Sequence, residues 1–204
     1  MKVTDIESVT NSKYKVYLDE QFAFVLYKGE LSRYRLQEGM EVSQTLIDTI
    51  KKEVVLKRAK LRAMHLLNDM DRTEAQLRQK LKQKAFEENI IEQTIEYVKS
   101  FGYIDDAKYA QRFVESRKKT KSKQEIVAML KEKGVSRELI TLALEECYSS
   151  EDAIEAIRHL AEKKHYSFEE STDKEKKKIY GYLLRKGFYH EEIRQVIQVS
   201  FWNA

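Results

Sequence analysis

Apolar and polar residues alternate along the first part of the chain. Residues 14–18 and 22–26 place apolar side chains at every second position, and polar residues 19–21 separate the two segments. This period of two on either side of a short polar turn predicts a β-hairpin. Because a lone hairpin is only marginally stable, we expect its apolar face to pack on a helix with Ser43 as N-cap and Ile47 on its inner side.

From about residue 56 the apolar period changes to that of an α-helix, and no later segment returns to alternation. Three stretches of this helical part can be aligned without gaps, and they begin 49 and then 53 residues apart. Such self-similarity indicates a repeat architecture. The three copies read TEAQLRQKLKQKAFEENIIEQTI from Thr73, SKQEIVAMLKEKGVSRELITLAL from Ser122 and EKKKIYGYLLRKGFYHEEIRQVI from Glu175.

Each copy predicts a helix, a tight turn and a second helix. Apolar residues four positions apart form the inner face, and a lysine ends the first helix, where its charge complements the helix dipole. Gly134 and Gly187 follow that lysine and allow a left-handed C-cap, whereas Ala85 breaks this rule in the first copy. The matched columns are Leu77/Ile126/Ile179, Leu81/Leu130/Leu183, Lys84/Lys133/Lys186, Phe86/Val135/Phe188, Ile91/Ile140/Ile193 and Ile95/Leu144/Ile197.

A further amphipathic helix is expected before each pair, over residues 57–70, 105–118 and 151–165, so each repeat has three helices. The predicted fold is all-α, with three tandem three-helix repeats in an elongated solenoid-like body and a small N-terminal module containing the β-hairpin. The expected segments are 1–55 for the N-terminal module, and 56–102, 103–149 and 150–204 for the repeats.

Composition agrees with a helical chain of a reducing compartment. Proline is absent and charged residues make up 35% of the 204 positions, which favours long solvated helices. Cys147 is the only cysteine, so an intrachain disulfide is impossible. The N-terminus lacks a signal-like apolar core and no segment has the length of a membrane span, so we expect a cytoplasmic protein that does not bind membranes.

The basic charge is unevenly distributed. Residues 1–56 contain 8 Lys and Arg against 9 Asp and Glu, whereas the remaining residues contain 30 against 25, within a net charge of +4. The densest cluster lies beside the expected N-terminus of the second repeat's middle helix, where lysines can bind phosphate or an acidic protein surface; the alternative is a solvated turn. This cluster consists of Arg117, Lys118, Lys119, Lys121 and Lys123.

A second candidate surface comes from the repeats themselves. Equivalent positions of stacked repeats fall along one edge, so basic residues just before each middle helix predict a stripe that follows a nucleoprotein filament. An ordinary soluble surface explains any single lysine equally well. The stripe comprises Arg72, Lys121 and Lys174, extended by Lys176, Lys177 and Lys178.

Nothing in the sequence indicates catalysis. The four histidines form no pair spaced for metal binding, and no glycine-rich phosphate loop is present. Cys147 is interpreted as an inert, buried thiol. We therefore expect no catalytic residue, no metal ligand, no cofactor and no enzymatic activity.

Two runs in the second repeat resemble the central motif of the RecX family. They are GYIDDAKYAQRFVESR, from Gly102 to Arg117, and KSKQEIVAMLKEKGV, from Lys121 to Val135. TEAQLRQKLKQKAF and KKKIYGYLLRKGF are similar to that family's flanking repeats, so the resemblance covers nearly the whole chain. Departures are Ala85, where the family usually has glycine, and Gln76, where an acidic residue is common.

The resemblance implies a modular helical protein that binds along the RecA filament, and usually inhibits its ATPase and strand exchange in recombination, DNA repair and the SOS response. It also implies binding of single- or double-stranded DNA. A monomer is expected, because extended repeat proteins are often monomeric. The alternative is a non-specific DNA-binding protein that acts through a basic stripe without RecA.

Overall fold

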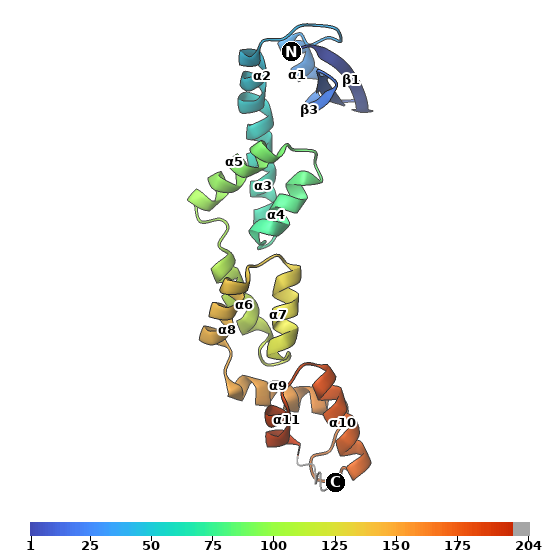
Figure 1. Ribbon diagram of the computed structural model, residues 1–204, viewed down its shortest axis with the longest axis vertical. Helices are drawn as coiled ribbons and strands as arrows, with labels where there is room; N and C mark the ends of the chain where they lie inside the picture. Colours follow the sequence, from blue (N-terminus) through green and yellow to red (C-terminus); the bar gives the residue numbers. More distant parts are fainter. Residues whose placement is uncertain (198–204) are drawn as a thin grey trace. The chain divides into compact units, whose positions relative to one another are not determined.

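The computed structural model describes residues 1–197, and their elements are drawn in Figure 1. Two compact units divide the chain, residues 1–105 and residues 106–204. The first unit contains the N-terminal sheet and the first three-helix repeat, and the second unit contains the other two repeats. Residues 198–204 of the expected third segment lie outside the described residues.

The N-terminal sheet has three antiparallel strands in the order β1 (Val3–Thr10), β2 (Lys13–Leu18) and β3 (Gln21–Tyr27). The predicted hairpin is β2–β3, and its two-residue turn places Asp19 and Glu20 at φ of 47° and 67°, as a tight hairpin of this hand requires. Strand β1 was not predicted from the sequence. The hairpin is therefore one part of a three-stranded sheet.

The sheet packs on the helix that was expected to support it. Val16 and Leu26 are fully buried against Ile47 and Ile50, and the side chain of Ser43 accepts the N-cap hydrogen bond from Leu46 N at 3.2 Å. A short helix, α1 (Lys28–Tyr34), follows the sheet and was not anticipated. These contacts give the N-terminal sheet its own hydrophobic core.

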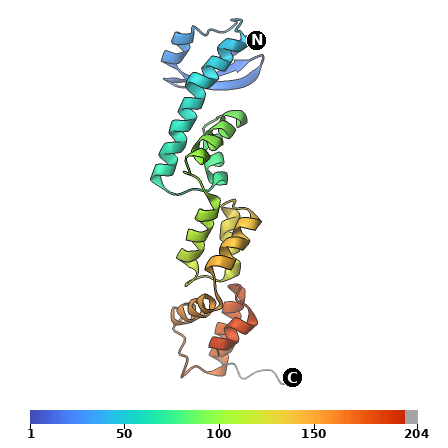
Figure 2. The same cartoon turned by 90° about the vertical axis from the view of Figure 1, so that its left-hand side faces the viewer.

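One continuous helix joins the sheet to the first repeat. It comprises α2 (Gln44–Ile50), a π-helical stretch η1 (Lys51–Leu56) and α3 (Lys57–Asp69), visible as the long cyan to teal helix in Figure 2. The expected division after residue 55 therefore falls inside a helix. The sheet and the first repeat share α3, since Ala59 packs in the sheet's core and Ala63 in the core of the repeat.

Each repeat consists of three helices around a separate core, as predicted. The middle and last helices supply the aligned apolar columns, and Leu81, Leu130 and Leu183 are fully buried in their three respective cores. The helices are α3, α4 (Glu74–Lys82) and α5 (Glu88–Ser100); α6 (Asp106–Arg117), α7 (Lys123–Glu132) and α8 (Arg137–Cys147); and α9 (Ser150–Glu162), α10 (Asp173–Arg185) and α11 (His190–Val196).

The turn between middle and last helix has the same backbone form in all three repeats. Ala85, Gly134 and Gly187 have φ of 58°, 79° and 85°, and the next residue's N–H closes the turn on the preceding helix in the last two. Ala85 thus adopts the left-handed conformation without being glycine, at a local cost in strain. Alanine in place of glycine at position 85 therefore changes the energy of this turn and not its geometry.

Candidate filament and nucleic-acid interface

The basic cluster of the second repeat lies at a helix junction, as the sequence indicated. Arg117 ends α6, Lys123 begins α7, and Ser122 between them accepts the N-cap hydrogen bond from Glu125 N at 3.1 Å. Lys123 is exposed and, within residues 1–197, makes no ion pair. The Arg117 guanidinium lies 5.8 Å from the centre of the Phe113 ring.

The other lysines of this cluster are paired with carboxylates. Lys118 Nζ lies 3.0 Å from Glu115 and 3.7 Å from Asp152, and its hydrogen bond to Glu115 raises the pKa of the ammonium. Lys119 Nζ lies 3.2 Å from Glu155. Asp152 and Glu155 belong to α9, the leading helix of the third repeat. Acidic residues from the neighbouring repeat therefore offset the repulsion among these lysines.

Lys121 takes part in a second set of contacts between these repeats. Its Nζ lies 3.4 Å from Glu125, and the same carboxylate oxygen lies 3.0 Å from Lys186 Nζ. Ser122 Oγ donates to the Lys186 carbonyl at 2.5 Å, and a Cβ placed on Gly187 would lie 2.8 Å from Gln124 Cβ. The N-terminus of α7 thus packs tightly on the turn of the third repeat. We call this set of contacts the joint.

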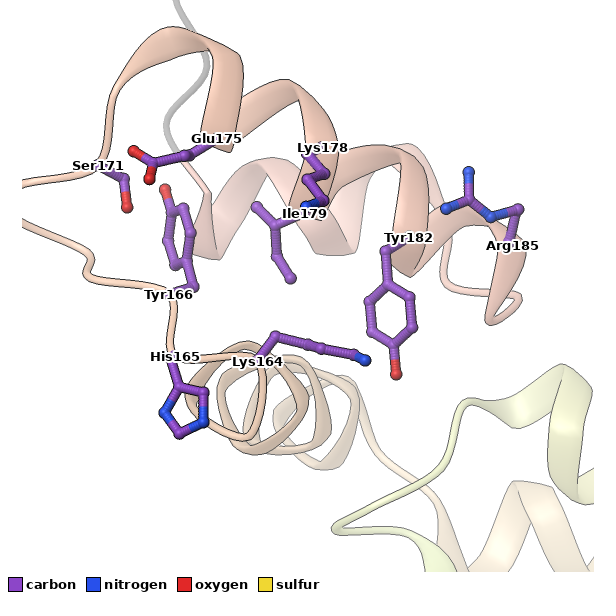
Figure 3. A pocket seen from close by; sticks show the side chains of 9 residues that line it. All are labelled: Lys164, His165, Tyr166, Ser171, Glu175, Lys178, Ile179, Tyr182 and Arg185. Atoms are coloured by element: carbon purple, nitrogen blue, oxygen red, sulfur yellow. The ribbon is translucent and has the colours of Figure 1, made fainter.

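A second basic surface of the second unit is a pocket between α10 and the segment that follows α9 in the third repeat. Its volume is about 330 Å³, near the lower end of the range of small-ligand sites, about 300–1,000 Å³. Figure 3 shows Lys164 extending along the pocket toward the ring of Tyr182, with His165 pointing away from α10. The Lys164 ammonium lies 5.2 Å from the centre of that ring. We call this cavity the third-repeat pocket.

Three cations of this pocket have no carboxylate partner. Lys164, Lys178 and Arg185 are exposed and make no ion pair within the described part of the chain. Among the described residues that line the pocket, the one acid is Glu175, which caps α10 by accepting from Thr172 N at 2.8 Å and Thr172 Oγ1 at 2.7 Å. These hydrogen bonds lower the pKa of Glu175. The pocket therefore retains positive charge for an anionic ligand.

The other residues of the predicted basic stripe do not share one position relative to the middle helix of their repeat. Arg72 donates from Nε to the Leu66 carbonyl at 3.0 Å, just before α4. Lys174 lies inside α10 and not before it, because the capping box of Thr172 starts that helix earlier than the repeat alignment indicated. Lys176, Lys177 and Lys178 also lie on α10, and among them only Lys178 lines the third-repeat pocket. A basic stripe across the repeats stays a prediction.

Two cations of the third-repeat pocket, Lys164 and Arg185, were missed by sequence reasoning. Lys164 lies two positions before Tyr166, and basic residues next to an aromatic residue are a sequence pattern that could have indicated a nucleic-acid contact here. Arg185 was not singled out, since basic residues at the end of a helix are explained by the helix dipole. The Lys84, Lys133 and Lys186 column was interpreted as structural, and Lys186 has a structural ion pair in the joint.

Other kinds of site find little support in the structure. In residues 1–197 no group of three or more His, Cys, Asp or Glu side chains is arranged to hold a metal ion. Burial raises the pKa of the half-buried Cys147 thiol, which lowers its reactivity. None of the helices described is both long enough and apolar enough to cross a bilayer.

Comparison with known proteins gives full-length relatives. The first, second and third three-helix domains of RecX match residues 59–97, 105–144 and 150–197. A protein named "Regulatory protein RecX" from Caldanaerobacter subterraneus is 31% identical over 96% of this chain and 97% of its own length. Another protein of that name, from Clostridium acetobutylicum, is 32% identical over 98% of this chain and 96% of its own length.

This chain belongs to the RecX family. A crystal structure of regulatory protein RecX has a TM-score of 0.66 and 27% identity, and the match covers 97% of this chain and 99% of that one. A RecX structure from Lactobacillus salivarius has a TM-score of 0.60 and 25% identity over 70% of this chain and 94% of that one. The expected resemblance to RecX and the expected fold class are confirmed.

Proposed function

We propose that this RecX-family protein binds the RecA nucleoprotein filament and modulates, in the inhibitory direction, its ATPase and DNA strand exchange. The observation that carries the proposal is the full-length match to regulatory proteins of this family. In this proposal the protein acts as a cytoplasmic monomer without catalysis. Its segments are an N-terminal module, residues 1–55, and three repeats, residues 56–102, 103–149 and 150–204.

A repeated architecture suits such a partner. Each repeat has its own core and presents exposed charged helix faces, so one chain offers several similar surfaces to a filament whose subunits also repeat. Weak contacts to successive subunits then add through effective concentration, and the overall affinity exceeds that of any single repeat.

The test is the ATPase of RecA on single-stranded DNA, with RecA from the same organism, as this protein is titrated from substoichiometric amounts. Inhibition far below one protein per RecA supports capping or disassembly of the filament, and inhibition near one-to-one supports binding along it. An unchanged ATPase at every ratio contradicts the proposal. A reaction with another DNA-dependent ATPase on the same DNA is the control for simple competition for DNA.

Direct DNA binding is a second candidate, and the third-repeat pocket favours it. Lys164, Lys178 and Arg185 carry charge without carboxylate partners in the described residues, beside the rings of Tyr166 and Tyr182. This combination suits contact with the phosphates of a nucleic acid. If electrostatic DNA binding is the whole function, DNA affinity falls steeply with salt and is the same with and without RecA.

A further inference from the structure

The first unit contains a larger basic groove, which lies between the N-terminal sheet and the first repeat. Its volume is about 480 Å³, and it is lined from three parts of the fold: the sheet, the continuous helix of η1 and α3, and the turn after α4. No carboxylate of residues 1–197 lines it. Its cations are Lys13 and Lys15 of β2, Arg58 and Arg62 of α3, and Lys84 of the turn. We call it the sheet–repeat groove.

Two of these five cations are already compensated by neighbouring acids. Lys15 Nζ lies 3.1 Å from Glu7 on the adjacent strand. Arg58 donates from Nη2 to Glu30 at 2.6 Å and from Nη1 to the Val25 carbonyl at 2.8 Å. The contacts of Arg58 hold the sheet and α3 together, and both cations shape the wall of the groove.

The other three cations have no carboxylate partner. Lys13, Arg62 and Lys84 are exposed and make no ion pair within residues 1–197, although each lines the groove. Lys13 and Arg62 are 49 positions apart along the chain, and Arg62 and Lys84 are 22 positions apart, so only folding brings them to one groove. Like charges that converge in this way repel one another, and a bound anion removes that cost.

The rest of the lining favours contact through phosphate rather than through bases. Tyr27 has an ammonium and a guanidinium near its ring, with Lys13 Nζ 5.5 Å and Arg58 Cζ 4.6 Å from the ring centre. The ring is therefore already in contact with protein cations, which leaves less of its face for stacking with a base. Val25, Val55 and Phe86 form apolar wall, and a low-dielectric wall strengthens the attraction between a phosphate and the cations beside it.

We propose that the sheet–repeat groove binds the phosphodiester backbone of a nucleic acid strand, with Lys13, Arg62 and Lys84 as the phosphate-binding residues. A strand fits better than a single phosphate ion, because the cations come from three separate elements and a strand presents negative charges at regular intervals. The contact is independent of base sequence. It deepens and rests on the DNA-binding part of the proposed function, and it requires no contact with RecA.

The test measures binding of a fluorescently labelled oligothymidylate to the full chain by anisotropy, over a series of salt concentrations. The variant Arg62→Ala/Lys84→Ala removes two unpaired cations. Its matched control is Lys52→Ala/Lys80→Ala, which removes two exposed lysines of the same unit that do not line the groove. Lys13→Ala, in a different element, is an independent second variant that leaves the turn after α4 unchanged.

We expect Arg62→Ala/Lys84→Ala to weaken binding about tenfold and to reduce the salt slope by about 1.4, at about 0.7 for each phosphate contact on a single strand. Lys13→Ala reduces it by about 0.7. The control double variant keeps nearly the full slope. Equal losses in the two double variants overturn the groove as the site, as does a full slope in Lys13→Ala.

Competition identifies the ligand class. Unlabelled oligothymidylate displaces the probe, whereas polyglutamate at the same charge concentration does not; equal displacement by polyglutamate overturns a nucleic acid ligand. The same variants in the RecA ATPase assay separate this inference from the proposed function. Loss of oligonucleotide binding with inhibition of RecA retained supports the groove and leaves the filament proposal intact. Inhibition that is already absent in the wild type contradicts the filament proposal alone.

Discussion

The joint and the third-repeat pocket are both basic and lie in the same unit, but their charges are arranged in opposite ways. In the joint and the cluster beside it, four lysines each lie within 4 Å of a carboxylate: Lys118, Lys119, Lys121 and Lys186. For Lys118, Lys119 and Lys186 a carboxylate of the neighbouring repeat is among the partners. In the pocket, Lys164, Lys178 and Arg185 are without such partners in the described residues. The denser run of lysines in the sequence is thus the one that is used internally.

This comparison shows that charge density along a chain is a poor measure of charge available to a ligand. Five basic residues within seven positions repel one another, and this protein relieves the repulsion by pairing three of them with acids. The predicted role of this cluster in binding stays a prediction. Lys118, Lys119 and Lys121 make ion pairs within the protein that do not depend on any ligand.

The largest expected effect is at the tightest contact of the joint. Gly187→Ala places a Cβ 2.8 Å from Gln124 Cβ on a residue at φ of 85°. Left-handed strain of about 1–2 kcal/mol and overpacking of about 1–3 kcal/mol together predict a loss of about 2–5 kcal/mol in the free energy of unfolding. Chemical denaturation measures this loss.

Gly102→Ala is the matched control for that substitution. Gly102 also has a left-handed φ, of 70°, but a Cβ placed on it would have no neighbouring atom within 4 Å. It therefore incurs only the conformational cost, about 1–2 kcal/mol. Equal losses at the two glycines would show that the repeats do not pack at the joint as described.

Charge reversal separates the two basic regions. Lys118→Glu/Lys119→Glu/Lys121→Glu places new carboxylates beside Glu115, Glu155 and Glu125, so we expect like-charge repulsion, screened at these partly exposed sites, to lower the melting temperature. Lys164→Glu/Lys178→Glu/Arg185→Glu breaks no ion pair of the described structure and leaves the melting temperature nearly unchanged, while weakening oligonucleotide binding. The comparison fails if the pocket variant is the less stable of the two.

Alkaline pH sharpens the same comparison. Hydrogen bonds to Glu115 and Glu125 raise the pKa of Lys118 and Lys186 in the folded state. A raised pKa contributes stability that is complete below the unfolded value, about 10.4, and is lost as pH rises through the folded value. We expect the melting temperature to fall above about pH 10, and Lys118→Gln/Lys186→Gln to make that fall smaller. An identical pH profile in this variant would contradict these ion pairs.

The smallest expected effect concerns the one turn between middle and last helix that lacks glycine. Ala85→Gly removes left-handed strain at φ of 58° but increases the entropy of the unfolded chain, so we expect a net gain of about 0.5–1 kcal/mol in the first repeat. Denaturation of the full chain with a probe in the first unit measures it. A loss of stability would mean that the alanine methyl group makes contacts that outweigh the strain.

The sequence predicted the repeat helices well and the N-terminal sheet only in part. Leu81, Leu130 and Leu183 were predicted as core residues, because a helical period repeated three times is a strong signal, and all three are fully buried. Strand β1 escaped notice because bulges between Val3 and Asp5 and between Ser8 and Thr10 break its period of two. Helix α1 buries no residue fully, and only Leu31 and Tyr34 pack partly against the sheet's core, so its apolar signal is weak.

The same contrast holds for the candidate sites. Residues adjacent in sequence, such as Lys118 and Lys119, were readily identified as a basic cluster. The sheet–repeat groove was not, because residues 1–56 have no basic excess and its cations lie on strands and helices far apart in the chain. Charge composition cannot reveal a site that exists only after the sheet packs on α3.

The sequence by itself determined the three repeats, their buried columns and the left-handed turns at Gly134 and Gly187, because these depend on local periodicity and on backbone conformation. Tertiary structure alone decided which cations pair with an acid of another repeat and which converge without one. Lys118 meets Asp152 and Lys186 meets Glu125 across contacts between repeats, while Lys13, Arg62 and Lys84 converge with no acid of the described residues among them. Ion pairing depends on distances of a few ångströms between residues distant in sequence, and only folding sets those distances.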